Sequence, residues 1–278
     1  MIGGVLTAMV TPFDADGGLD EEASAALIRH LLANGSDGVV LAGTTGEGPT
    51  LSDDEDVALW TVGVEAADGA PVIAGTGSND TRHTIELIER AAARGVHAAM
   101  VVTPYYNRPS REGVVAHYRA VAAATDLPIV LYNIPQRTGL DMPNDLLAEL
   151  GQIETVVAVK QARYEDLEPV DGLDLLAGND DLLARVMGLG GTGGILVASH
   201  LVGEQMRRVV DGDSQAEEAL LPLYEALSVA PAAASMKTAL GLLGHPVGKP
   251  RLPLVEPGAD AVDAIRSALE TQGLLERV

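Results

Sequence analysis

The hydrophobic pattern of the chain alternates between short apolar runs and longer amphipathic stretches. A short continuous apolar run is typical of a strand that is buried on both faces of a parallel sheet. The predicted strands are residues 5–10, 38–42, 72–74, 98–102, 129–132, 156–160, 173–176 and 194–197. Helical periodicity separates them, most clearly in residues 21–33, 53–67, 81–94, 112–124 and 180–189.

Eight strands that each precede a helix predict an α/β fold, a (β/α)₈ TIM barrel over residues 1–200. A doubly wound sheet is the alternative, but no G-x-G-x-x-G sequence follows the first strand. Residues 201–278 are expected to form a C-terminal helical extension packed on the barrel. Its predicted helices are residues 203–211, 215–229, 232–243 and 260–272.

One strand ends in a lysine, in the run Thr155-Val156-Val157-Ala158-Val159-Lys160. An amine at the mouth of an apolar core loses its hydration, which disfavours the ammonium form. A neutral lysine amine is a nucleophile toward a carbonyl carbon. The alternative is a strand-end lysine that reaches into solvent. Because the chain has only three lysines, Lys160 is the first candidate for a reactive group.

Barrel enzymes build their sites at the carboxyl ends of the strands, so the residues there are the informative ones. The second strand leads into Gly43-Thr44-Thr45-Gly46-Glu47-Gly48, whose backbone N–H groups suit an anion. Tyr105 and Tyr106 follow the fourth strand, and Tyr132 ends the fifth, with Arg137 beyond it. An arginine there suits a carboxylate. A plain glycine turn, a subunit contact and a surface ion pair remain the alternative interpretations.

Composition excludes several classes of protein. With no cysteine, the chain has neither disulfides nor thiolate ligands, and its six histidines show no metal-ligand spacing. No run of apolar residues is long enough for a membrane span, and the N-terminus lacks a basic signal region. We therefore expect a cytoplasmic protein without a metal.

The charge of the chain is strongly negative: 40 acidic and 18 basic residues give −22. This charge argues against nucleic acid and anionic membranes as partners. Acidic excess with few lysines favours a halophilic protein, because salt screens the self-repulsion. An ordinary acidic protein from a GC-rich genome is the alternative.

Several motifs together resemble one family, the dihydrodipicolinate synthase / N-acetylneuraminate lyase family of class I aldolases. The motifs occur in family order over nearly the whole chain: Val10-Thr11-Pro12-Phe13, Gly43-Thr44-Thr45-Gly46-Glu47, Thr103-Pro104-Tyr105-Tyr106-Asn107, Tyr132-Asn133-Ile134-Pro135 and Val159-Lys160. The resemblance implies an enzyme that binds pyruvate as a Schiff base and needs no cofactor. It also implies a homo-oligomer, expected to be a tetramer built as a dimer of dimers.

The resemblance assigns roles to the candidate residues. Lys160 would form the imine with pyruvate, and Tyr132 would carry protons. Thr44 would link Tyr132 to Tyr106 of a neighbouring subunit, and Thr45 would hold the pyruvate carboxylate. The imine then acts as an electron sink from which an enamine nucleophile forms.

The second substrate depends on other positions. The backbone of Ile195 would line the pyruvate side, and Arg137 resembles the arginine with which the synthase branch grips the carboxylate of aspartate semialdehyde. An aldolase for 2-keto-3-deoxy sugar acids is the alternative, and a non-catalytic pyruvate-binding barrel is a third. Departures from the family pattern occur at Gly48, Gln136, Leu196 and Gln161-Ala162-Arg163.

A lysine feedback site in the family lies at a dimer contact. Asp53, Asp56 and His83 stand where lysine-sensitive members often carry His, His and Glu, and only Asn79 and Tyr105 match. We therefore expect weak or absent inhibition by lysine.

Overall fold

The fold is a closed barrel of eight parallel strands in the order β1 to β8. A computed structural model describes residues 2–213 and 215–276. The strands are β1 Gly4–Ala8, β2 Gly38–Leu41, β3 Val72–Gly75, β4 Ala98–Val102, β5 Ile129–Asn133, β6 Val156–Gln161, β7 Asp174–Ala177 and β8 Gly193–Leu196. All eight predicted strands are therefore confirmed, with small shifts at their ends, and the TIM-barrel fold with them.

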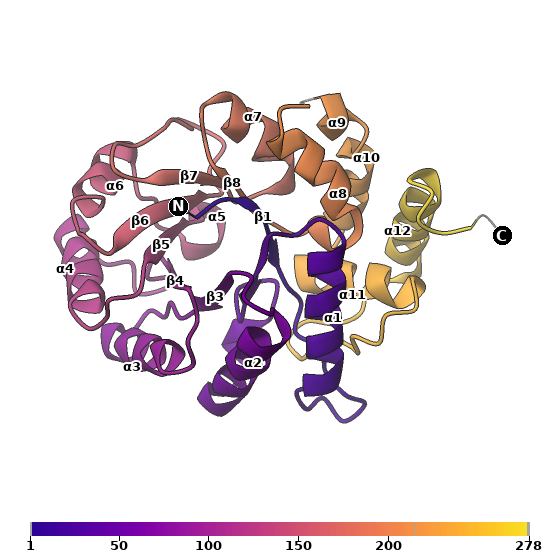
Figure 1. The fold of residues 1–278 in the computed structure, drawn as a ribbon, viewed down its shortest axis with the longest axis horizontal. Coiled ribbons are helices and arrows are strands. Elements are labelled where there is room, and N and C mark those ends of the chain that lie inside the picture. Colours follow the sequence, from indigo (N-terminus) through magenta and orange to yellow (C-terminus); the bar gives the residue numbers. More distant parts are fainter. Residues whose placement is uncertain (1, 214, 277–278) are drawn as a thin grey trace.

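Helices surround the barrel (Figure 1). They are α1 Glu21–Ala33, α2 Asp53–Ala66, α3 Thr81–Ala92, α4 Arg111–Ala122, α6 Asn144–Leu150, α7 Leu183–Gly188 and α8 Ser199–Val210. Short helical turns lie at the strand ends: η1 Gly48–Thr50, α5 Pro135–Thr138 and η2 Asp180–Leu182. The expected alternation is wrong at one place, because residues 162–173 between β6 and β7 form no helix.

Two apolar clusters hold the barrel together. The larger one lies between the strands and the surrounding helices, and includes Trp60 and Tyr118. The smaller one fills the barrel interior, with Leu6, Ile73 and Met100 among its members. Because side chains alternate along a strand, each strand contributes to both clusters.

The C-terminal helices are α9 Gln215–Glu218, α10 Leu221–Leu227, α11 Ala232–Leu242 and α12 Ala259–Thr271. Figure 1 shows α11 and α12 outside the barrel, on the side of α1 and α8. The single helix expected over residues 215–229 is wrong, because Pro222 starts a new helix. The boundary expected after residue 200 falls inside α8, and the division into two units stays a prediction. Among the described residues, no helix has the length and apolar character needed to cross a membrane.

Candidate active site

Lys160 and Tyr132 lie side by side at the carboxyl ends of β6 and β5. The two residues are register partners in the parallel pair. Both side chains point into the barrel, and each residue is only 4% exposed. The Nζ atom of Lys160 lies 4.3 Å from the centroid of the Tyr132 ring, in a cation–π contact. The structure thus brings together two of the residues that the sequence singled out.

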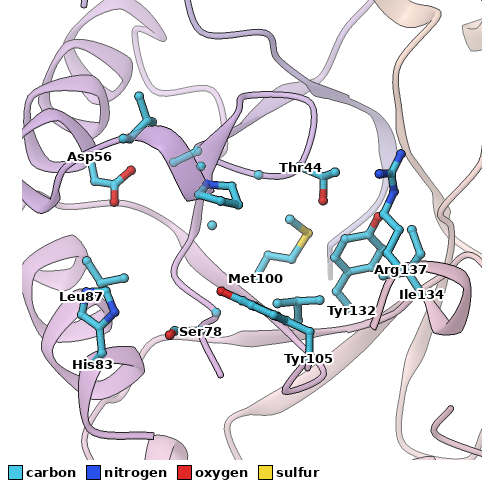
Figure 2. A pocket seen from close by; sticks show the side chains of 18 of the residues that line it. Thr44, Asp56, Ser78, His83, Leu87, Met100, Tyr105, Tyr132, Ile134 and Arg137 are labelled. Atoms are coloured by element: carbon cyan, nitrogen blue, oxygen red, sulfur yellow. The ribbon is translucent and has the colours of Figure 1, made fainter. Parts of the chain in front are cut away.

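A cavity of about 420 Å³ opens beside this pair. Thr44, Tyr132 and Arg137 line it, so the loop after β2 meets the end of β5 and the turn α5 there. Figure 2 shows these three side chains near Ile134 at one end of the cavity. Thr44 and Arg137 are solvent-accessible, as residues that receive a substrate from outside must be. The predicted hydrogen bond between Thr44 and Tyr132 stays a prediction.

The remaining predicted residues occupy three different surroundings. Thr45 is buried in the loop after β2, and Ile195 is fully buried in β8 among the barrel interior. Tyr106 is 89% exposed and adopts the left-handed region, with φ at 68°. A bulky residue rarely adopts this conformation, so its surroundings must fix it. Tyr106 is also not among the residues that line the cavity of its own chain.

The loop that carries Thr44 and Thr45 is tightly folded. Gly48 N donates to Gly43 O at 3.1 Å, closing the turn. A Cβ atom at Gly48 would lie 2.4 Å from the carbonyl oxygen of Ala42, a distance no side chain tolerates. Glycine at position 48, a departure from the family pattern, is thus required by the backbone of this chain.

Asp180 is a charged neighbour that the sequence did not single out. Its carboxylate accepts hydrogen bonds from Val197 N at 2.8 Å and Ala198 N at 3.1 Å, just after β8. Burial raises the pKa of Asp180 to about 6, while these two N–H groups and the nearby Lys160 ammonium oppose the rise. Asp180 therefore adds negative charge to the environment of Lys160 and joins β7 to β8.

A hydrogen-bonded network lies behind Lys160 and Tyr132. Asn133 follows Tyr132, and Gln161 follows Lys160, and Asn133 Nδ2 donates to Gln161 Oε1 at 3.0 Å. Asn133 Nδ2 also reaches Asp141 Oδ1 at 2.9 Å, and Asp141 Oδ2 pairs with the buried Arg163 at 2.8 Å. We call Asn133, Asp141, Gln161 and Arg163 the strand-end network. Its side chains explain two of the unusual positions, Gln161 and Arg163.

The far end of the cavity is acidic. His83 Nε2 lies 3.0 Å from Asp53 Oδ1, and Asp56 is buried with no hydrogen-bond partner for its Oδ1. Burial, and then the charges of Asp53 and Glu55, raise the pKa of Asp56 to about 7. Figure 2 shows Asp56 and His83 apart from Thr44 and Arg137, with Met100 and Tyr105 between them.

Metal ligands are scarce at the site. Within residues 2–213 and 215–276, no group of three His, Asp or Glu side chains is placed to hold a metal ion. Of the predicted residues, a hydroxyl, a phenol and a guanidinium line the cavity, and the buried Lys160 amine contacts the Tyr132 ring.

Comparison with known proteins places the chain in one family. The sequence model of the Dihydrodipicolinate synthetase family matches residues 1–272. The 4-hydroxy-tetrahydrodipicolinate synthase of Moorella thermoacetica is 45% identical over 98% of this chain and 99% of its own. Among solved structures, the chloride-inhibited dihydrodipicolinate synthase of Acinetobacter baumannii complexed with pyruvate has a TM-score of 0.94 and 33% identity, over 99% of this chain and 100% of its own. The lysine-bound enzyme of Cyanidioschyzon merolae has the same TM-score and 38% identity, over 98% of this chain and 99% of its own. The chain therefore belongs to the dihydrodipicolinate synthetase family.

Proposed function

We propose that this protein is a 4-hydroxy-tetrahydrodipicolinate synthase, a lyase of diaminopimelate and lysine biosynthesis that condenses pyruvate with aspartate semialdehyde. The observation that carries the proposal is the buried Lys160 amine beside Tyr132, next to a cavity that also receives Arg137. The names of full-length relatives at 40–45% identity support the same reaction.

The chemistry begins at Lys160. Its amine attacks the ketone carbon of pyruvate, and loss of water leaves an imine. Loss of a proton from the pyruvate methyl group then gives an enamine, whose carbon attacks the aldehyde of the second substrate. Tyr132 is placed to pass protons in these steps because its ring packs on the lysine amine. The amino group of the semialdehyde finally displaces Lys160 at the imine carbon, which closes the ring and frees the enzyme.

Substrate binding falls to the loops. Thr45 and the neighbouring N–H groups hold the pyruvate carboxylate, Thr44 connects to Tyr132, and the backbone of Ile195 lines the pyruvate side. Arg137 holds the carboxylate of the semialdehyde, because a guanidinium forms paired hydrogen bonds with a carboxylate. No cofactor takes part in this scheme, because the covalent imine on Lys160 supplies the electron sink.

The aldehyde is the point at which the alternative differs. A 2-keto-3-deoxy sugar-acid aldolase would use the same lysine with an uncharged aldehyde. We expect the parent enzyme to turn over aspartate semialdehyde much faster than glyceraldehyde. Replacing Arg137 with Ala is expected to raise the KM for the semialdehyde about tenfold or more, through loss of charged hydrogen bonds.

Coupled turnover assays with the two aldehydes test this expectation. Arg119→Ala is the matched control, because Arg119 lies in α4 with an exposed side chain and does not line the cavity. Faster turnover of glyceraldehyde, or an unchanged KM in Arg137→Ala, would favour the sugar-acid aldolase.

Assembly and location extend the proposal. An exposed aromatic ring on a strained backbone, Tyr106, suits a contact between subunits, and we propose a homotetramer formed as a dimer of dimers. Small-molecule metabolites are the proposed partners, and the cytoplasm is the proposed site of action. Weak or absent inhibition by lysine and adaptation to high salt stay predictions of the sequence.

A further inference from the structure

A second lysine of the chain is also buried. Lys237 lies in α11, and its Nζ atom is 2.7 Å from Glu47 Oε1, with side-chain exposures of 2% and 0% for the two residues. The same Nζ donates to the carbonyl oxygen of Lys249 at 3.1 Å and lies 3.9 Å from the centroid of the Phe13 ring. Burial lowers the pKa of Lys237, and Glu47 opposes that change. The proposed reaction uses neither residue of this Glu47–Lys237 pair.

Glu47 belongs to the loop that carries Thr44 and Thr45. Its N–H donates to Thr44 O at 3.2 Å, and its backbone has the left-handed φ of 57°. Its second carboxylate oxygen accepts a hydrogen bond from Arg251 N at 2.8 Å. The C-terminal extension therefore holds this carboxylate at both oxygens, from α11 and from the segment that follows it.

Stability alone does not account for a buried pair of this kind. Removing two charges from water costs several kcal/mol per ion, and well-packed apolar replacements are often as stable or more so. Glu47 also retains a backbone conformation that is unfavourable for a residue with a side chain. Both costs point to a geometric requirement at the loop.

We propose that Glu47 and Lys237 are positioning residues for the reaction: their ion pair ties the C-terminal extension to the loop after β2 and fixes Thr45 and the neighbouring N–H groups against the pyruvate carboxylate. The pair acts through the loop and does not itself touch the substrate. The inference rests on the proposed function, because it assigns the pyruvate carboxylate to this loop.

Two variants separate positioning from stability. Lys237→Met leaves the Glu47 carboxylate buried without its cation, so it is expected to lower stability as well as pyruvate binding. Glu47→Leu/Lys237→Met removes both charges, so it is expected to unfold at a denaturant concentration near that of the parent. The double variant is nevertheless expected to need about tenfold more pyruvate, because the loop has lost its anchor.

The readout is the fraction of protein trapped by borohydride as pyruvate is increased, with the KM for each substrate and kcat. We expect a higher pyruvate requirement, with the semialdehyde KM and kcat at saturating pyruvate near those of the parent. Lys249→Met is the control, because it removes only the exposed pair with Glu256 and is expected to bind pyruvate normally.

A folded double variant with the parent's pyruvate requirement would overturn the inference. If the double variant does not fold, Glu47→Gln is measured instead, because its amide removes the ion pair, keeps the side-chain shape and still accepts from Arg251 N. A folded Glu47→Gln protein with the parent's pyruvate requirement would likewise overturn the inference. A parent that traps no pyruvate would instead refute the proposed function. The two failures are therefore distinct.

Discussion

At the residue scale, the site depends on how a buried amine is surrounded. Lys160 has an aromatic face on one side, supplied by Tyr132, and negative charge nearby, supplied by Asp180. The ring and the carboxylate both stabilise a positive charge at this position. The same surroundings also suit the imine, because a protonated imine carries the positive charge in the same place.

The buried Asp56 gives the protein a measurable pH dependence. Its pKa is raised from an ordinary value near 4 to about 7, so its contribution to stability is complete below about pH 4 and is lost as the pH rises through 7. Asp56→Asn removes this loss. We expect the difference in unfolding free energy between the variant and the parent to grow by roughly 2 kcal/mol, in favour of the variant, as the pH rises from 5 to 8.

Urea unfolding of both proteins at several pH values measures this difference. The pKa values of His117 and His200 are lowered to about 4 by burial, and they act in the opposite direction, but they are common to both proteins and cancel. Asp54→Asn is the control because its side chain is 99% exposed. A constant difference between Asp56→Asn and the parent at all pH values would contradict this account.

The sequence predicted some site residues and missed others for a physical reason. Lys160, Tyr132 and Arg137 were predictable because each lies at the end of an apolar run or just beyond it. Active sites of barrel enzymes lie at these strand ends. Asp180 and Lys237 were not, since their partners are far away in the chain. Only the folded structure brings such residues together.

At the element scale, the adjacent strands β5 and β6 carry the two residues at the centre of the proposed reaction, Tyr132 and Lys160. The strand-end network fixes their ends against each other, because Asn133 Nδ2 donates to Gln161 Oε1 one residue beyond Tyr132 and Lys160. Met142 N also donates to Asn133 Oδ1 at 3.1 Å, so the chain that follows β5 is held to the same point. The network thus keeps the amine and the phenol adjacent.

Strands were easier to predict than the segments between them. A buried strand needs an uninterrupted apolar run, which the sequence shows directly. A connection needs only to span two strands, so residues 162–173 reach β7 without a helix. The turns η1 and α5 likewise escaped prediction, because each is a few residues long and begins beside a proline.

At the scale of the whole molecule, the C-terminal extension contacts the barrel next to the loop after β2, through Lys237 and Arg251. Arg251 illustrates this, because its guanidinium lies 4.1 Å from the Phe13 ring centroid and donates to Glu55 Oε2 at 2.9 Å. It thereby joins the chain after α11 to the N-cap region of α2, where Glu55 closes a capping box with Ser52. The sequence predicted a helical extension, although not the break between α9 and α10, and it did not predict the contacts that these helices make.

The proposed assembly has a direct test. If Tyr106 acts in a neighbouring subunit, a mixed oligomer of Lys160→Ala and Tyr106→Phe contains sites with both Lys160 and Tyr106 intact. Alone, Lys160→Ala is expected to lose about a hundredfold or more in kcat. Tyr106→Phe alone is expected to lose about tenfold or more. After unfolding and refolding together, the mixture should exceed the sum of the two.

Turnover of the refolded mixture is the measurement, and separately refolded variants are its control. Activity equal to the sum of the separate variants, in a mixture shown by mass to contain hybrids, would place Tyr106 outside the neighbour's site. A fully active monomer in sedimentation would contradict the proposed oligomer itself.

The central claim is that Lys160 forms an imine with pyruvate. The most direct measurement is the mass of the intact protein after treatment with pyruvate and borohydride in molar salt, followed by mapping of the modified peptide. We expect one adduct, on Lys160, in the parent and in Lys249→Ala, and none in Lys160→Ala. No adduct in the folded parent, or an adduct on Lys237, would contradict the account.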